Sequence, residues 1–132
     1  MENQVKKKLT ISELIDNKEK FQTKNDIKEE LYLDQLDATI TIIKPERSLV
    51  MDTIEMANDK KFEGDSDDFF VYNIVVEPNL KDPELQKAYG CVEPVDIVSE
   101  IFDIGTISGI AKAGMKLGGY ESNVTVVENL KN

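Results

Sequence analysis

The densest group of acidic side chains lies in the middle of the sequence, at Glu63, Asp65, Asp67 and Asp68. Carboxylate oxygens are the ligands that Mg²⁺ and Ca²⁺ prefer, so a cation site is one interpretation of this group. Its spacing differs from that of a calcium-binding loop, which needs a glycine at its sixth position and a glutamate at its twelfth. We favour the simpler interpretation, a solvated loop followed by the acidic first turn of a helix.

Two further carboxylates, Glu77 and Glu93, each precede a proline and could serve as a general acid and base. Helix boundaries explain both residues equally well, because prolines often begin or end helices. Cys91 is the single cysteine, so no internal disulfide forms, and a reducing cytoplasm is the natural compartment. Its neighbours Gly90 and Val92 offer no cation that would lower the pKa of the thiol, so we expect a structural cysteine.

The sequence contains no histidine. This excludes Ser-His-Asp and Cys-His catalysis as well as zinc sites with histidine ligands. The segment GTISGIAKAG, residues 105–114, spaces its glycines unlike a dinucleotide fingerprint or a P-loop. We expect its small residues to let the last helix approach a neighbouring element closely, and we predict no catalytic residue, cofactor or metal.

The composition is that of a globular protein, with 40% apolar and 32% charged residues in a chain of 132 residues. A chain of this length fits one domain. Its apolar runs fall far short of the ~20 residues that span a bilayer. The lysines at 6–8 precede charged residues rather than the apolar stretch of a signal peptide, so we expect neither membrane insertion nor export.

The net charge of −10 is unevenly distributed. Residues 1–30 hold seven lysines and seven acidic residues, whereas residues 31–132 hold nine basic and nineteen acidic residues. The acidic body would repel phosphate backbones, which argues against nucleic-acid binding and favours a basic or amphipathic protein partner. The alternative that the acidity only maintains solubility stays open.

The first expected helix begins near Ile11, because Thr10 and Glu13 form a capping box that satisfies free backbone N–H groups. Its apolar side chains share one side of the helix, at Ile11, Leu14, Ile15 and Phe21. Residues 31–43 alternate apolar and polar side chains and are rich in β-branched residues, which predicts a hairpin that turns at residues 35–37. Two strands alone are marginally stable, so one face of the hairpin must pack against helices.

Helices are expected over most of the remaining chain. Ser48 is the expected cap of the next one. Residues 67–76 have the composition of a strand but follow the acidic start of a helix, and we predict a central helix that Pro78 ends. Prolines that favour first turns and glycines that favour helix ends then predict helices over 83–89, 94–102 and 106–117, with Gly105 as the break before the last.

These elements predict one mostly helical α+β domain of five or six short helices with a single β-hairpin near residues 31–43. We place the folded domain at residues 9–120. Residues 1–8 are expected to be a flexible basic N-terminus, and residues 121–132 a flexible C-terminal tail.

Four segments resemble the XkdN-like tail assembly chaperones of PBSX-type contractile-tailed phages and phage-like particles of Gram-positive bacteria. They are LTISELIDNKEK, ITIIKPERSLVMDTIEMA, FFVYNIVVEPNLKDPELQKAYGCVEPVDIVSEIF and GTISGIAKAGMKLGGY, which together run from about Leu9 to Tyr120. The long third segment is the most specific of the four.

The resemblance implies a binding protein without catalysis. Its client would be the tape measure protein, a long helical chain that must stay soluble in the host cytoplasm while tail tube subunits polymerise around it. The tail tube protein and a second copy of the chain are further possible partners. A structural tail or baseplate component retained in the particle is the alternative function, and a carboxylate-metal enzyme is a more remote one.

An apolar groove for a client helix is predicted between the 83–89 segment and the last helix. Its candidate residues are Leu80, Leu85, Tyr89, Ile104, Ile107, Ile110, Leu117 and Tyr120. Most of these could instead be ordinary core residues. Tyr89 and Tyr120 are the favoured exposed anchors, because aromatic side chains are enriched at binding hot spots.

Overall fold

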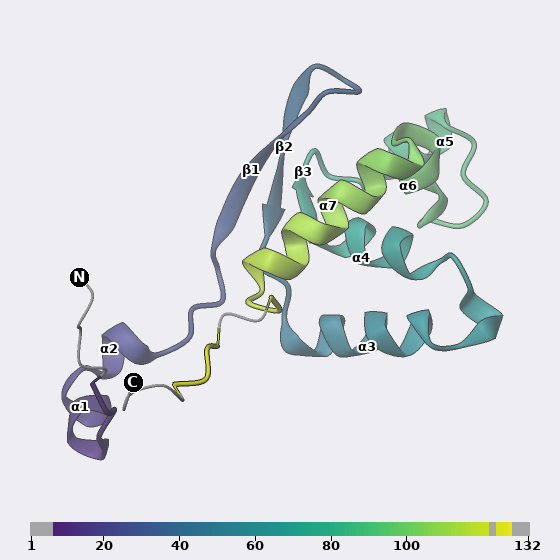
Figure 1. Cartoon of the computed structure of the whole chain (residues 1–132). Coiled ribbons are helices and arrows are strands. Elements are labelled where there is room, and N and C mark those ends of the chain that lie inside the picture. The colour runs from purple at the N-terminus through teal and green to yellow at the C-terminus, as the bar shows by residue number, and fades with distance from the viewer. Residues whose placement is uncertain (1–6, 122–123, 128–132) are drawn as a thin grey trace.

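The computed structural model describes residues 7–121 and 124–127 (Figure 1). A small antiparallel sheet and five of the helices form a body, and a helical arm extends from it. The predicted mostly helical α+β domain is confirmed. The described residues hold seven α-helices rather than five or six, because the first expected helix is divided in two. The predicted flexible ends fall largely on residues 1–6, 122–123 and 128–132, which lie outside the described residues.

The arm consists of α1 (Ile11–Asp16) and α2 (Lys18–Phe21). The predicted capping box is present. The Glu13 N–H donates to Thr10 Oγ1, and the Thr10 N–H donates to Glu13 Oε1, each at a distance of 3.2 Å. The helix breaks at Asn17, whose side-chain amide donates to the Glu13 carbonyl at 3.1 Å. Such a local side-chain bond competes with helix continuation, which explains the two short helices.

The sheet has the strand order β1–β2–β3. The predicted hairpin is formed by β1 (Lys28–Leu33) and β2 (Ala38–Ile43). Leu31 lies opposite Ile40, so the apolar residues of both strands share the face that the helices cover. The short β3 (Val75–Glu77) pairs antiparallel with β2 and was not expected.

The predicted helix over 67–76 is observed as α4 (Ser66–Ile74) and ends two residues early. The β-branched pair Val75 and Val76 adopts the extended conformation and pairs with β2 instead. The acidic residues at the start of this segment therefore predicted the helix correctly, and its β-branched residues predicted a strand that forms at its end.

Helix α3 (Arg47–Ala57) begins one residue before its expected cap, with Glu46 at the N-cap and no side-chain cap bond. A single 3₁₀ turn, η1 (Lys60–Phe62), connects it to α4. The expected proline start is confirmed in α5 (Pro83–Ala88), where Asp82 accepts a hydrogen bond from the Leu85 N–H at 3.0 Å.

The last two helices are α6 (Asp96–Ile101) and α7 (Ile104–Leu117). Gly105 was expected to separate them but lies inside α7. The break falls instead at Phe102 and Asp103, whose backbones are extended. The Asp103 N–H donates to the side chain of Gln35 at 2.8 Å, so a contact from the distant hairpin turn sets where α7 begins.

The core centres on α4, as predicted. Phe70, Val71 and Ile74 of this helix are fully buried, and α4 packs against α3, α6 and α7. The other buried apolar residues come from the sheet, the surrounding helices and two of their connections: Leu33, Ile40, Ile42, Val50, Val75, Leu80, Ile97, Val98, Phe102, Ile107, Ile110 and Ala111.

Candidate partner-binding groove

An open groove of roughly 630 Å³ runs between β1 and α7. We call it the β1–α7 groove. Its β1 side spans residues 30–35, and its α7 side begins at Asp103 and runs from Gly105 to Ala113. At 1.5 Å of rise per residue, the lining part of α7 is about 12 Å long, which is a little over two helical turns. The groove therefore matches the length of a short helical segment.

The floor of the groove is apolar. Leu31 and Leu33 reach it from β1, where alternation places both on the helix-covered face. Ile110 and Ala113 reach it from α7, one turn apart. Leu33 and Ile110 are also members of the core, so the floor is part of the rigid body of the protein.

Gly105 and Gly109, which have no side chains, line the α7 side of the groove. A Cβ atom added at Gly105 or Gly109 would meet nothing within 4 Å, so no contact within the chain requires glycine there. At Gly114, by contrast, it would lie 2.4 Å from Ile74 Cδ1. The expected close approach of α7 to a neighbour is thus made by Gly114 alone, while the other two glycines leave open space.

The residues that line the groove carry charge of one sign. Glu30, Asp34 and Asp103 are all exposed, and no lysine or arginine is among the lining residues. An apolar floor with an acidic border suits an amphipathic segment whose polar side bears lysine or arginine.

Gln35 joins the two walls at one end of the groove. Its side-chain Nε2 donates to the Ile101 carbonyl at 3.0 Å, while its Oε1 accepts from the Asp103 N–H at 2.8 Å. These bonds tie the hairpin turn to the start of α7. Beside them, the Tyr32 hydroxyl donates to Asp37 Oδ1, and this bond to a carboxylate raises the pKa of Tyr32.

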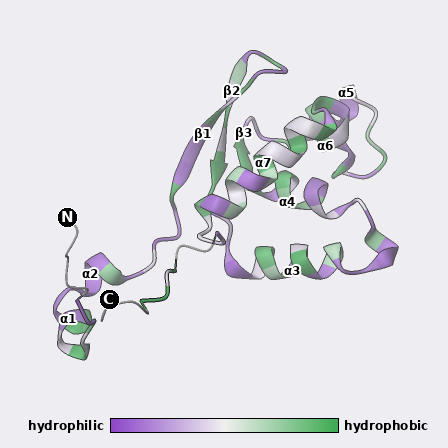
Figure 2. Cartoon of the chain, viewed as in Figure 1, coloured by the Kyte–Doolittle hydropathy of each residue, from purple (hydrophilic) through white to green (hydrophobic). Residues whose placement is uncertain are grey.

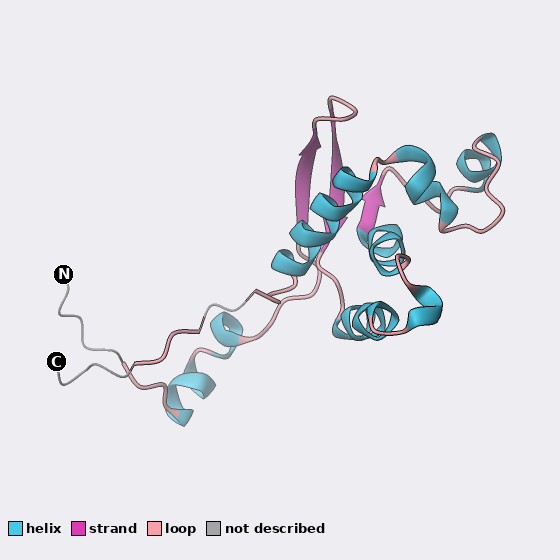
Figure 3. Cartoon of the chain, turned by 45° about the vertical axis from the view of Figure 1, so that its right-hand side comes forward, coloured by secondary structure: helices cyan, strands magenta, loops and turns pink. Residues whose placement is uncertain are grey.

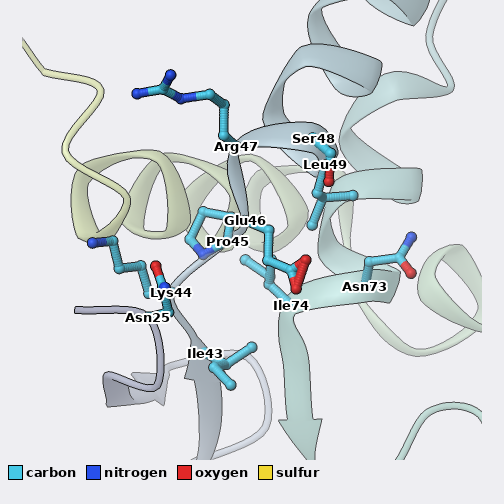
Figure 4. A pocket seen from close by; sticks show the side chains of 10 residues that line it. All are labelled: Asn25, Ile43, Lys44, Pro45, Glu46, Arg47, Ser48, Leu49, Asn73 and Ile74. Carbon is cyan, nitrogen blue, oxygen red and sulfur yellow. The ribbon is translucent and has the colours of Figure 1, made fainter. Parts of the chain in front are cut away.

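A second cavity, of roughly 690 Å³, lies where the arm joins the body (Figure 4). Ile43, Pro45 and Ile74 give it apolar surface, but Lys44, Glu46 and other polar residues surround them. Lys44 Nζ already donates to the Lys24 carbonyl of the linker at 2.6 Å. The lining of this cavity combines positive and negative side chains, Lys44 and Arg47 with Glu46, around a comparable apolar surface, whereas the charged lining residues of the β1–α7 groove are all acidic.

The structure divides the eight predicted site residues into three groups. Leu80, Ile107 and Ile110 are buried in the core, and Leu85 and Leu117 are half-buried against it. Exposure is greatest for Ile104 at 87%, followed by Tyr89 at 46% and Tyr120 at 43%. Ile110 alone among the eight lines the β1–α7 groove. The tyrosines favoured as exposed anchors are indeed at the surface.

The sequence reasoning missed the other eleven lining residues: Glu30, Leu31, Tyr32, Leu33, Asp34, Gln35, Asp103, Gly105, Thr106, Gly109 and Ala113. One signal was available, since Gly105, Gly109 and Ala113 recur every four residues and so share one side of α7. The pairing of that side with β1 was not available, because it depends on how the hairpin packs.

The acidic group at Glu63, Asp65, Asp67 and Asp68 does not form a recognisable metal-binding cluster. Within residues 7–121 and 124–127, no set of three or more His, Cys, Asp or Glu residues is placed to hold a metal ion. Burial, together with the charges of Asp65, Asp67 and Asp96, raises the pKa of Asp68. Burial, with Glu100 and Asp96, likewise raises the pKa of the Cys91 thiol, which disfavours the reactive thiolate.

Comparison with known protein families identifies a family for nearly the whole chain. Residues 2–131 match the family model described as phage XkdN-like tail assembly chaperone protein. No curated protein and no solved structure matches the chain. Among the helices of the described residues, none has the length and apolar content of a bilayer span.

Proposed function

Since the chain belongs to the phage XkdN-like tail assembly chaperones, we propose that it binds the tape measure protein of a phage tail and keeps it soluble during assembly. The binding step involves no catalysis and takes place in the host cytoplasm. The client contributes an amphipathic helix whose apolar stripe would otherwise self-associate.

The observation that carries this proposal is the β1–α7 groove. The groove is about two helical turns long, which is enough for the i, i+3, i+4 and i+7 anchors of a helix laid in a groove. Leu31 and Ala113 are half-buried at its floor, while Leu33 and Ile110 are buried in the core. Glycine inside a helix costs about 0.5–1 kcal/mol relative to alanine. No internal contact requires that cost at Gly109. A client helix that occupies the space beside Gly109 would explain why glycine stands at this position.

Acidic residues around the groove would select the client by charge. Glu30, Asp34 and Asp103 are exposed residues of the groove lining. Strand alternation directs the Glu30 side chain to the face opposite Leu31 and Leu33. A helix with lysine or arginine beside its apolar stripe is attracted, whereas an acidic helix is repelled. The interaction should therefore weaken as salt is raised.

The test is co-expression with the tape measure protein encoded beside the chaperone, with the soluble fraction of the client as the measurement. Gly109→Leu fills the groove with a good helix former and should abolish solubilisation and co-purification. Ser108→Leu is the matched control, because it adds the same side chain to the adjacent, exposed position outside the groove. A client that stays equally soluble with the Gly109→Leu variant would refute the assignment of the groove.

The alternative is a structural component of the tail or baseplate. Mass spectrometry of purified particles separates the two functions, because a structural component remains at stoichiometric amounts while a chaperone is absent. For the carboxylate-metal alternative, titration calorimetry with Mg²⁺, Mn²⁺ and Ca²⁺ should give no binding heat.

A further inference from the structure

The arm carries an apolar face that is exposed among the described residues 7–121 and 124–127. Neither α1 nor α2 has a buried residue, and Ile11 and Ile15 are 77% and 69% exposed. Leu14 and Phe21 are also exposed. Figure 2 shows apolar residues on both helices, and Figures 1 and 3 show the arm projecting from the body. The face predicted from the sequence is therefore present, and the part of the chain that the structure describes does not bury it.

The arm is nevertheless built as a helix. Its capping box is complete, and Lys7 forms an ion pair with Glu13. Isolated helices as short as α1, with six residues, are marginal in water without tertiary contacts. The capping box and the ion pair stabilise a helix that lacks tertiary contacts among the described residues, which is what a helix that binds a partner surface needs.

The linker directs the arm away from its own body. The Lys44 N–H donates to the Ile27 carbonyl at 2.7 Å, and Lys44 Nζ donates to the Lys24 carbonyl at 2.6 Å. Both bonds hold the linker beside the end of β2, at the opposite end of the hairpin from Gln35. An arm fixed in this direction reaches outward, toward another molecule.

The β1–α7 groove of a second copy complements the arm in size, polarity and charge. The six residues of α1 span about 9 Å and fit within the groove's length of about 12 Å. Ile11, Leu14 and Ile15 have the i, i+3, i+4 spacing of helix-in-groove anchors. The α1 helix itself carries Glu13 and Asp16 and no basic residue, so the charge opposite to the groove's three acids comes from the flanking parts of the arm. Residues 7–24 as a whole hold five lysines and three acidic residues.

We propose that the arm of one copy binds in the β1–α7 groove of a second copy. The arm and the groove are different surfaces, so each copy uses one of each and association proceeds head to tail. Chains or rings of the chaperone then form when no client is present. The inference rests on the same groove as the proposed function, and arm and client compete for it.

The first experiment measures the molar mass of the purified full chain, without client, over a range of concentrations by light scattering and sedimentation velocity. The wild-type mass should rise with concentration. The double variant Ile11→Ser, Ile15→Ser should raise the concentration of half-association about a hundredfold or more, because two apolar anchors are lost. Gly109→Leu should have a similar effect, whereas Ser108→Leu should behave as wild type.

The decisive experiment mixes the two defective variants. Gly109→Leu keeps a working arm with a blocked groove, while the double serine variant keeps a working groove with a defective arm. Each alone should be monomeric, and together they should form a one-to-one dimer that grows no further.

Three outcomes would overturn the proposal: a wild-type chain that is monomeric at every concentration, variants that associate as wild type does, or mixed variants that form no dimer. The proposed function is tested separately, by the soluble fraction of the client on co-expression. A monomeric chaperone that still needs Gly109 to solubilise its client would remove only the self-association.

Discussion

The two glycines at 109 and 114 lie five residues apart on α7 and should respond to alanine in opposite directions. At Gly109 an added Cβ meets nothing within 4 Å. The Gly109→Ala variant should therefore gain only the helix propensity of alanine, about 0.5–1 kcal/mol in the free energy of unfolding.

At Gly114 the added Cβ would lie 2.4 Å from Ile74 Cδ1 and 2.9 Å from Phe70 Cε2. Both neighbours are fully buried in α4. Overpacking of this kind costs about 1–3 kcal/mol. The propensity gain of up to about 1 kcal/mol offsets part of it, so Gly114→Ala should lose about 1–2 kcal/mol.

Urea denaturation followed by circular dichroism measures both variants against the wild type. The midpoint should rise for Gly109→Ala and fall for Gly114→Ala, with an unchanged slope. Client binding by Gly109→Ala should weaken despite its higher stability, because the methyl group enters the groove. A Gly109→Ala variant that is less stable than wild type, or a Gly114→Ala variant that is more stable, would refute this view of α7.

The remaining predictions concern single side chains outside the α7 glycines. Gln35→Ala should cost about 1–3 kcal/mol for its two hydrogen bonds and speed amide hydrogen exchange at Asp103; unchanged exchange there would contradict the tie between turn and helix. Asp68→Asn should stabilise the fold near pH 7, because a raised folded pKa means that ionisation of Asp68 opposes folding as pH rises. That gain should vanish as pH falls below the ordinary pKa of aspartate, and a loss of stability at pH 7 would show that the helix-dipole contribution of Asp68 outweighs the repulsion. Cys91 should react with iodoacetamide near pH 8 more slowly in the folded than in the urea-unfolded chain, because its thiol pKa is raised; equal rates would count against this.

The sequence by itself determined most of the elements and where several of them begin. Thr10 with Glu13 and Asp82 with Pro83 fix helix starts, and alternation over residues 31–43 fixes the hairpin. These signals are reliable because caps, prolines and side-chain period act within a few residues along the chain. The family resemblance likewise depended on ordered segments of sequence.

Only the tertiary structure decided which apolar faces are covered. Ile104 and Ile107 are equally apolar and three residues apart, yet one is 87% exposed and the other is 5% exposed. The exposed face of the arm and the open space at Gly109 were also not readable from the sequence. A local pattern shows that a helix has an apolar side, but whether that side is buried depends on contacts between residues far apart in the chain.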